Sequence, residues 1–263
     1  MNISHTSFIV DLTQTLQHWQ IISFMALSDV RARYKRSVLG PLWLTLGTAA
    51  GSVGLGLLWS ELLKIEAKAF VPSLTAGLIL WQFISGVITE SSTLYGRQAA
   101  IIRNMSLPLM IHPLQLLFKH LINVAHNAPV YLLVALVLSI PLTVSTLWFL
   151  PCLLLVSLNL FWICMLVSVL GARFRDLEYI IAAVMPLLMF ISPVFYRPNY
   201  LPFSEGLIWA NPLSHLIEII RYPLLGSSPP MFVVQTNLVM LLVGGGFALW
   251  LFNKKRDRIA FWV

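Results

Sequence analysis

Residues 146–170 read TLWFLPCLLLVSLNLFWICMLVSVL, a run without a single Asp, Glu, Lys or Arg. A helix of about 20 apolar residues crosses the roughly 30 Å hydrocarbon core of a bilayer, because each residue adds about 1.5 Å. The run therefore predicts a transmembrane helix. The composition agrees, since 58% of the 263 residues are hydrophobic and 10% are charged, against about a quarter charged in a soluble domain.

The same criterion, applied outward from this run, finds five more. The six runs are residues 39–60, 72–94, 116–139, 146–170, 179–195 and 231–252. The fifth is short and contains Pro186 and Pro193. An even number of spans places both termini on one side of the membrane. The sequence thus predicts an all-α integral membrane protein, with an interface segment over 1–38 and a six-span domain over 39–263.

The basic residues are distributed unevenly among the connections between these runs. Thirteen of the 17 Lys and Arg residues fall in segments 1–38, 95–120, 171–178 and 253–263. Cytoplasmic connections carry such an excess. Both termini are therefore predicted to be cytoplasmic, and the net charge of +7 reflects membrane orientation rather than nucleic-acid binding.

The segment before the first span combines an amphipathic pattern with a cationic cluster. Leu12, Leu16 and Trp19 recur at helical spacing among polar residues, which predicts an amphipathic helix in the cytoplasmic interface; a frayed terminus is the alternative. The cluster consists of Arg31, Arg33, Tyr34, Lys35 and Arg36. It fits an orientation signal, a lipid-surface anchor or a recognition site for an anionic substrate.

The connection between the second and third spans, YGRQAAIIRNMSLPLMIHPL (95–114), is longer than a turn requires. It predicts a short helix over 97–104, with Ile101 and Ile102 beside Arg97 and Arg103, ended by the prolines that follow. Such a helix is either a docking element for a soluble partner or an interfacial loop helix.

The outer stretch 196–230 is too apolar for a free loop and predicts a helical hairpin that dips back into the membrane. Asn211 followed by Pro212 is a helix-start signal. The helix that follows has one apolar face and one polar face. His215 and Glu218 lie three residues apart and are expected to be a solvated pair, with paired acid and base chemistry as the alternative.

The sequence contains no phosphate loop, zinc-binding or nucleophile-elbow motif. Cys152 and Cys164 lie within one apolar run and are expected to be small buried residues. Acidic residues are nearly absent from the predicted spans, and Glu90, near the inner end of the second span, is the closest case. This scarcity of acids argues against a proton-coupled carrier, which needs ionisable groups within the membrane. A chain without energy-coupling chemistry fits the membrane half of a machine driven by a separate subunit.

Four motifs point to a known family. RARYKRSVLGPLW (31–43), SPVFY (192–196), NPLSHLIEIIRYPLLG (211–226) and RDRIAFW (256–262) resemble the permease subunits of ABC-2 type polysaccharide exporters, especially those for lipopolysaccharide O-antigen. The resemblance runs from about residue 10 to 262.

The resemblance implies a non-enzymatic permease in the bacterial inner membrane. It implies a homodimer working with two copies of a separate ATPase, which carries the ATP and Mg, so that this chain holds no cofactor. The implied cargo is a polyprenyl-diphosphate-linked glycan exported from cytoplasm to periplasm.

The resemblance also assigns roles to residues of this sequence. Arg31, Arg33, Tyr34, Lys35 and Arg36 match a gate segment at the cytoplasmic entrance, where each Lys or Arg near a diphosphate contributes about 1 kcal/mol. Stretches 200–209 and 212–222 match periplasmic gate helices. Residues matching the coupling helix, which docks on the ATPase, are Arg97, Ile101, Ile102, Arg103 and Asn104.

A sugar polymer needs a wet or aromatic-lined path, because each unpaired hydroxyl in hydrocarbon costs several kcal/mol. Aromatic side chains that fit such a channel are Trp43, Trp59, Trp81, Tyr95, Phe190, Phe195 and Tyr196; the alternative, and the more common role of such residues, is an interfacial belt.

Three alternatives stay open at this point. The first is an ABC-2 permease for another cargo, such as teichoic acid, capsule, a lipid or a drug. The second is a membrane-embedded enzyme acting on polyprenyl phosphates, for which Asp176 and Glu178 beside Arg173 and Arg175 are the available groups. The third is a scaffolding membrane protein.

Overall fold

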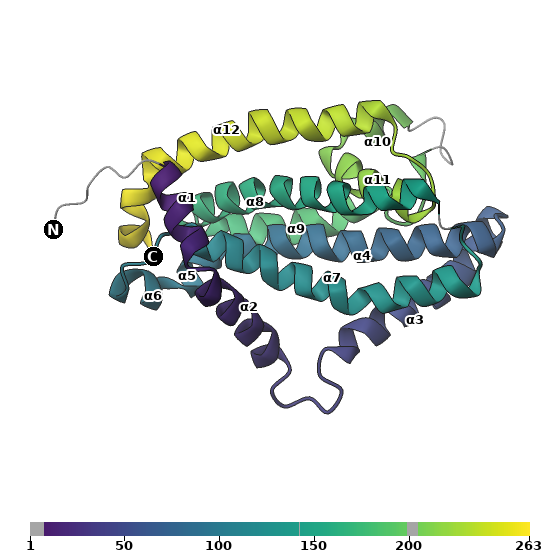
Figure 1. Ribbon diagram of the computed structural model, residues 1–263, viewed down its shortest axis with the longest axis horizontal. Coiled ribbons are helices and arrows are strands. Elements are labelled where there is room, and N and C mark those ends of the chain that lie inside the picture. The colour runs from purple at the N-terminus through teal and green to yellow at the C-terminus, as the bar shows by residue number, and fades with distance from the viewer. Residues whose placement is uncertain (1–7, 142, 199–204) are drawn as a thin grey trace.

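The computed structural model describes residues 8–141, 143–198 and 205–263, and every regular element in those ranges is a helix (Figure 1). The predicted all-α class is therefore confirmed. The helices are α1 (Phe8–Gln17), α2 (Trp19–Arg33), α3 (Leu42–Leu63), α4 (Ala67–Ser91), α5 (Leu94–Arg97), α6 (Ala99–Asn104), α7 (Ile111–Val137), the 3-10 helix η1 (Val144–Trp148), α8 (Phe149–Arg173), α9 (Asp176–Ile191), α10 (Glu205–Ala210), α11 (Pro212–Leu224) and α12 (Met231–Trp262).

Within the described residues, five helices are long and apolar enough to cross a membrane. They are α3, α4, α7, η1 continued by α8, and α12, and each coincides with a predicted span. The run predicted as the remaining span forms α9, which has 16 residues and is about 24 Å long. That length is short of the hydrocarbon thickness, so the sixth span stays a prediction.

Helix α4 is the centre of the bundle. It packs against α3, α7, α8, α9 and α11, and 78% of its spanning window is buried, against 17% for α3 and 22% for α12. Its buried residues include Phe70, Leu74, Phe83 and Ile84. A helix enclosed by others has no need of an apolar surface all round, which lets α4 carry polar side chains at depth.

Different helices form the two ends of the bundle. The start of α1, the short helices α5 and α6 and the end of α12 lie at one end, here called the basic end, and α10 and α11 lie at the opposite end (Figure 1). Helix α12 continues past the predicted span end at residue 252 to Trp262. The extra turns carry Lys254, Lys255, Arg256 and Arg258, which leave the apolar pattern but favour helix.

The interface segment forms two helices rather than one, with a break at His18. Ile22, Ala26 and Val30 of α2 are buried against α7. Trp19 packs edge-on against Phe118 at 4.9 Å between ring centroids. The α2 and α3 helices then meet at a bend over residues 34–41 and form a V whose apex projects from the bundle, while α2 packs against α7 and α3 packs against α4 and α7 (Figure 1).

The predicted helix start at Asn211 is confirmed, because its side chain accepts a hydrogen bond from the Leu213 N–H at 3.0 Å. Helices α10 and α11 form the described part of the expected hairpin. Residues 200–204 of the first predicted gate helix lie outside the described residues. The dip into the membrane stays a prediction.

The expectation of a solvated polar face on α11 was wrong. Ser214, His215, Glu218 and Arg221 are all at most 5% exposed. Nε2 of His215 bonds the Trp209 carbonyl at 2.8 Å, so this nitrogen turns to a backbone oxygen rather than to Glu218. The polar face is buried because its side chains form hydrogen bonds with carbonyl groups at the end of α10 and in the non-helical backbone after α9.

Arg221 explains this burial. Its guanidinium pairs with Glu218 at 2.6 Å and donates to carbonyls just beyond α9, those of Pro193, Val194 (3.3 Å) and Tyr196 (3.1 Å). Irregular backbone at membrane depth is tolerated where protein groups satisfy it. The ion pair therefore joins α11 to the chain break after α9.

Candidate functional site

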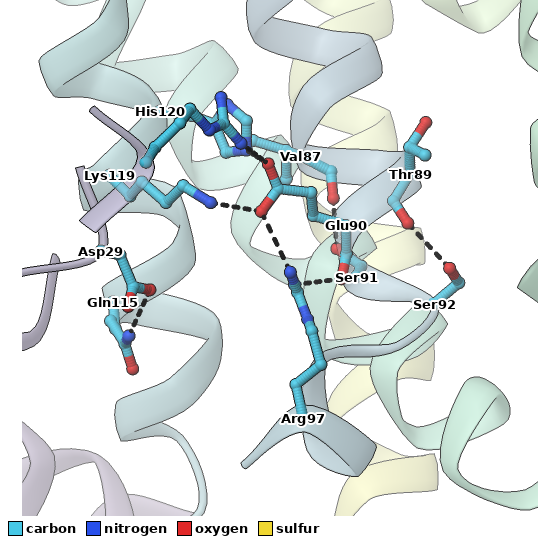
Figure 2. A network of polar contacts seen from close by, with 11 residues as sticks. Asp29, Val87, Thr89, Glu90, Ser91, Ser92, Arg97, Gln115, Lys119 and His120 are labelled. Carbon is cyan, nitrogen blue, oxygen red and sulfur yellow. Dashed lines mark hydrogen bonds and ion pairs between the residues drawn. The ribbon is translucent and has the colours of Figure 1, made fainter. Parts of the chain in front are cut away.

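Glu90, in the last turn of α4, is contacted by three cationic side chains and one histidine from three other helices. Its Oε1 lies 2.9 Å from Arg33 Nη2 of α2 and 3.4 Å from His120 Nε2 of α7. Its Oε2 contacts Lys119 Nζ of α7 and lies 3.5 Å from Arg97 Nη1 of α5. Figure 2 shows Lys119, His120 and Arg97 pointing toward this one carboxylate. The group of Glu90, Arg33, Arg97, Lys119 and His120 is called the Glu90 cluster below.

The local sequence places Arg97 by ending α4 sharply. The Ser91 hydroxyl donates to the Val87 carbonyl at 2.5 Å, and the Ser92 hydroxyl donates to the Thr89 carbonyl at 2.7 Å. The chain then turns into α5, and Arg97 Nη2 donates back to the Glu90 carbonyl at 3.0 Å (Figure 2). Arg97 is thus held at both the side chain and the backbone of Glu90.

Two glycines allow the close packing around this turn. A Cβ at Gly86 would overlap the His120 ring, and a Cβ at Gly171 of α8 would overlap the Ser92 carbonyl. Only glycine lets α7 and α8 approach α4 and its end this closely. The geometry of the Glu90 cluster therefore depends on these two positions.

The Glu90 cluster is partly enclosed and cationic. The side chains of Lys119 and Glu90 are 7% and 17% exposed, whereas those of Arg33 and Arg97 are 45% and 47% exposed. Three permanent cations face one carboxylate. A second carboxylate, that of Asp29 on α2, accepts a hydrogen bond from Gln115 at 2.9 Å (Figure 2).

A cavity of about 400 Å³ lies on the α2 and α5 side of the cluster. Its polar lining consists of Asp29, Arg33, Arg97, Gln98, Gln115 and Lys119. A second cavity, of about 230 Å³, includes Arg33, Glu90 and His120 and continues to Gln82, Asn123 and Asn127. Arg33 lines both cavities.

An amide bridge crosses the bundle beside the second cavity. Gln82 of α4 donates to the Thr48 hydroxyl of α3 at 3.0 Å and accepts from the Asn127 amide of α7 at 3.0 Å. Hydrogen bonds between spanning helices hold them together where lipid offers no hydrophobic drive. The bridge fixes α3, α4 and α7 at the depth of the cavity.

The gate segment predicted from sequence lies at the α2–α3 bend. Arg31 and Arg33 occupy the last turn of α2, and Tyr34 caps it. Arg31, Lys35 and Arg36 are exposed, and no ion pair engages them among the described residues. Gly40 has a φ of 55°, a conformation that glycine adopts easily, and it turns the chain into α3. The structure thus separates Arg33, which is paired, from three free cations.

The segment predicted as a coupling helix over 97–104 holds the last residue of α5 and the whole of α6. Arg97 ends α5, Gln98 lies at the break, and α6 holds Ile101 and Ile102, both partly buried. Arg103 and Asn104 are exposed, and Arg103 donates to the Val263 carbonyl at the end of α12. The predicted short helix is present and ends at Asn104, but it begins at Ala99 rather than Arg97, because the chain breaks at Gln98.

The channel candidates divide into two groups. Trp59 stacks on Phe195 at 6.1 Å, Phe195 lies 5.7 Å from Phe190, and the Tyr196 hydroxyl donates to the Phe190 carbonyl at 3.1 Å. These four form one aromatic group where α9 ends beside α3.

The remaining three candidates do not join that group. Trp43 is 59% exposed on α3, whereas Trp81 and Tyr95 are 6% and 1% exposed. Trp81 and Tyr95 lie in the protein core in this conformation, and a channel role for these residues stays a prediction.

Several functional groups were missed or underused by the sequence reasoning. Lys119, Gln82 and Asn127 lie within apolar runs, where a polar side chain is costly and marks a site or a pairing. That signal was available for each of them. Cys152 and Cys164 are buried and free, as expected. His112 is buried next to Tyr95, and His126 Nδ1 bonds the Ile122 carbonyl.

Comparisons with known proteins identify a family for the chain. A family model described as ABC-2 type transporter matches residues 21–225. A protein of Klebsiella pneumoniae named O-antigen export system permease protein RfbA is 26% identical over 242 residues, which cover 88% of this chain and 90% of the relative. A second Klebsiella pneumoniae protein of that name is 24% identical over the same shares. One from Myxococcus xanthus is 19% identical, covering 93% and 95%.

Proposed function

The chain belongs to the ABC-2 type transporter family, and from that premise we propose that it is the permease of an ATP-driven exporter of O-antigen polysaccharide. The cargo is a polyprenyl-diphosphate-linked glycan, moved from the cytoplasm to the periplasm across the bacterial inner membrane. The names of relatives that span most of both chains support the cargo class.

The proposed assembly is a homodimer with two copies of an ATPase subunit that binds ATP and Mg. The basic end, with α5, α6 and the end of α12, is the proposed cytoplasmic face and ATPase-docking side. In this orientation both termini are cytoplasmic, as the excess of Lys and Arg there favours.

One observation carries the proposal: the gate segment and the coupling segment share a carboxylate. Arg33 from the gate segment and Arg97 from the coupling segment both pair with Glu90. Movement of α5 and α6 on the ATPase would therefore pull on the same group that holds α2. A scaffold or a lipid-phosphate enzyme has no need of such a connection.

Three exposed cations of the gate segment are the proposed first contact for the lipid diphosphate. Arg31, Lys35 and Arg36 have no ion-pair partner within the described part of the chain, and guanidinium groups bind phosphate in a bidentate manner. Each cation near the headgroup contributes about 1 kcal/mol of attraction.

The test is reconstitution with a candidate ABC-type ATPase subunit. The two proteins should copurify, and ATP hydrolysis should respond to polyprenyl-diphosphate glycan. Replacing Arg31, Lys35 and Arg36 together by Gln should abolish that response while the complex still assembles. Thiol labelling of a Ser37→Cys variant checks that topology is unchanged. A chain that assembles with no ATPase, or hydrolysis that ignores the glycan, would remove the exporter assignment.

A further inference from the structure

We propose that Arg33 and Arg97 form a phosphate-binding site whose resident anion, in the absence of ligand, is the Glu90 carboxylate. The ligand class is a phosphate or diphosphate. Its identity as a lipid headgroup rests on the proposed function, since a lipid diphosphate is the phosphate that such an exporter meets. The site is distinct from the exposed bend, because Arg97 and Lys119 belong to other helices.

The first support is the excess of cations around one carboxylate. Arg33, Arg97 and Lys119 all contact Glu90, which cannot neutralise three positive charges. Asp29 also lines the adjoining cavity, and it reduces the excess without removing it. The site retains one net positive charge and so attracts a further anion.

The second support is the difference in exposure among the side chains that contact Glu90. Lys119 and His120 are 7% and 5% exposed and hold Glu90 from the protein interior, whereas Arg33 and Arg97 are nearly half exposed. The two arginines are therefore the groups able to turn toward a ligand. Glu90 keeps Lys119 and His120 as partners when they do.

The third support is space. Arg33, Arg97 and Lys119 line the cavity of about 400 Å³ together with the amides of Gln98 and Gln115. A water molecule occupies about 30 Å³ in the liquid, so the cavity has room for a group much larger than one water. A diphosphate presents two phosphate groups, one for each arginine, and each guanidinium offers a planar fork that matches phosphate oxygens.

Exchange of Glu90 for a diphosphate would change how the helices are connected. Before exchange, α2 and α5 are joined through the end of α4. After exchange, they are joined through the ligand. The coupling segment would then register an occupied gate directly, because Arg97 lies one residue before the break that begins α6.

The experiment measures ligand binding to the purified full-length chain in lipid nanodiscs by tryptophan fluorescence. The probes are farnesyl diphosphate, inorganic pyrophosphate and farnesol. Arg33→Gln and Arg97→Gln should each weaken binding of farnesyl diphosphate about tenfold or more, the usual effect of losing a charged hydrogen bond. Lys254→Gln, which removes a cation of the basic end outside the cavity, should leave binding unchanged.

The decisive variant is Glu90→Gln. If Glu90 is a competing anion, its removal should tighten binding of farnesyl diphosphate, by about tenfold for one displaced charge pair. A merely structural role for Glu90 predicts weaker or unchanged binding, and that result would overturn the proposal. Arg97→Lys keeps the charge without the planar fork, and an intermediate affinity is expected even where Arg97→Gln does not fold.

The probes separate the possible sources of phosphate. Tighter binding of farnesyl diphosphate than of pyrophosphate supports a lipid headgroup, and equal binding supports a free phosphate at the same site. Unchanged binding in Arg97→Gln, with binding lost in the Arg31, Lys35 and Arg36 triple variant, overturns this site but leaves the exporter assignment intact. Absence of any diphosphate binding overturns the site, while assembly with the ATPase still tests the exporter.

Discussion

Replacing Arg221 by Met tests whether the buried ion pair of α11 holds the hairpin end together. The change leaves the Glu218 carboxylate without its cation in a place where both side chains are 0% exposed. Breaking one side of a buried pair costs about 3–5 kcal/mol. At about 1.4 kcal/mol for each factor of ten, the folded-to-unfolded ratio should fall by about two to four orders of magnitude.

The assay is reversible unfolding in mixed SDS and nonionic micelles, followed by tryptophan fluorescence and circular dichroism. Asp257→Asn is the matched control, because it breaks the Arg256–Asp257 pair at 3.6 Å, in which Asp257 is 48% exposed. Exposed pairs contribute about 0–1 kcal/mol. If Arg221→Met destabilises the protein no more than this control does, the clamp described for α11 is wrong.

A double variant distinguishes the two tasks of Arg221. Replacing Glu218 by Leu together with Arg221→Met removes the uncompensated charge, and apolar replacement of a whole buried pair is often neutral. The carbonyls of Val194 and Tyr196 would still lack their donor, which costs about 1–3 kcal/mol for each unsatisfied group. Stability should therefore recover only in part. Full recovery would show that the hydrogen bonds from Arg221 to the backbone contribute nothing to the free energy of unfolding.

Three further predictions concern other parts of the fold. Gly171→Ala should destabilise the chain by about 1–3 kcal/mol in the same SDS titration, because the new Cβ overlaps the Ser92 carbonyl; an unchanged midpoint would contradict the close approach. Asn127→Leu removes the amide bond to α4 and should cost about 0.6–2 kcal/mol, and a gain in stability would show that the bridge is not favourable. If α9 spans the membrane, impermeant thiol reagents should label Asp176→Cys and Ser227→Cys from opposite sides, and labelling from one side would remove the sixth span.

The five helices that are long and apolar enough to cross a membrane could be predicted from the sequence, because the thickness of the bilayer sets a minimum length for apolar runs. The helix ends could not be predicted in the same way. Helix α12 runs on to Trp262 because its basic residues favour helix although they end the apolar run. Helix α9 is short because the chain breaks near Pro193, and the length of the run does not show where the break falls.

Only part of the candidate site could be predicted from the sequence. The cationic cluster of the bend and the short coupling segment stand out as local patterns. The convergence of Arg33, Arg97 and Lys119 on Glu90 does not, because it joins residues up to 86 positions apart through the packing of α2, α5 and α7. The sequence pattern of α11 likewise predicts a solvated polar face, whereas the structure buries it. A helical pattern shows that two faces differ, but not whether the polar face meets water or buried backbone.

The enclosure of α4 has a consequence for how the protein responds to the lipid around it. Membranes of different thickness act on helices that contact lipid, which tilt to match the hydrocarbon at a cost of a fraction of a kcal/mol per Å. Helices α3 and α12 are largely exposed and would follow such changes, whereas α4 is shielded by its neighbours. Thicker or thinner bilayers should therefore alter the angle between α3 and α4 first. The lipid composition of the host membrane would therefore affect the angle between α2 and α3.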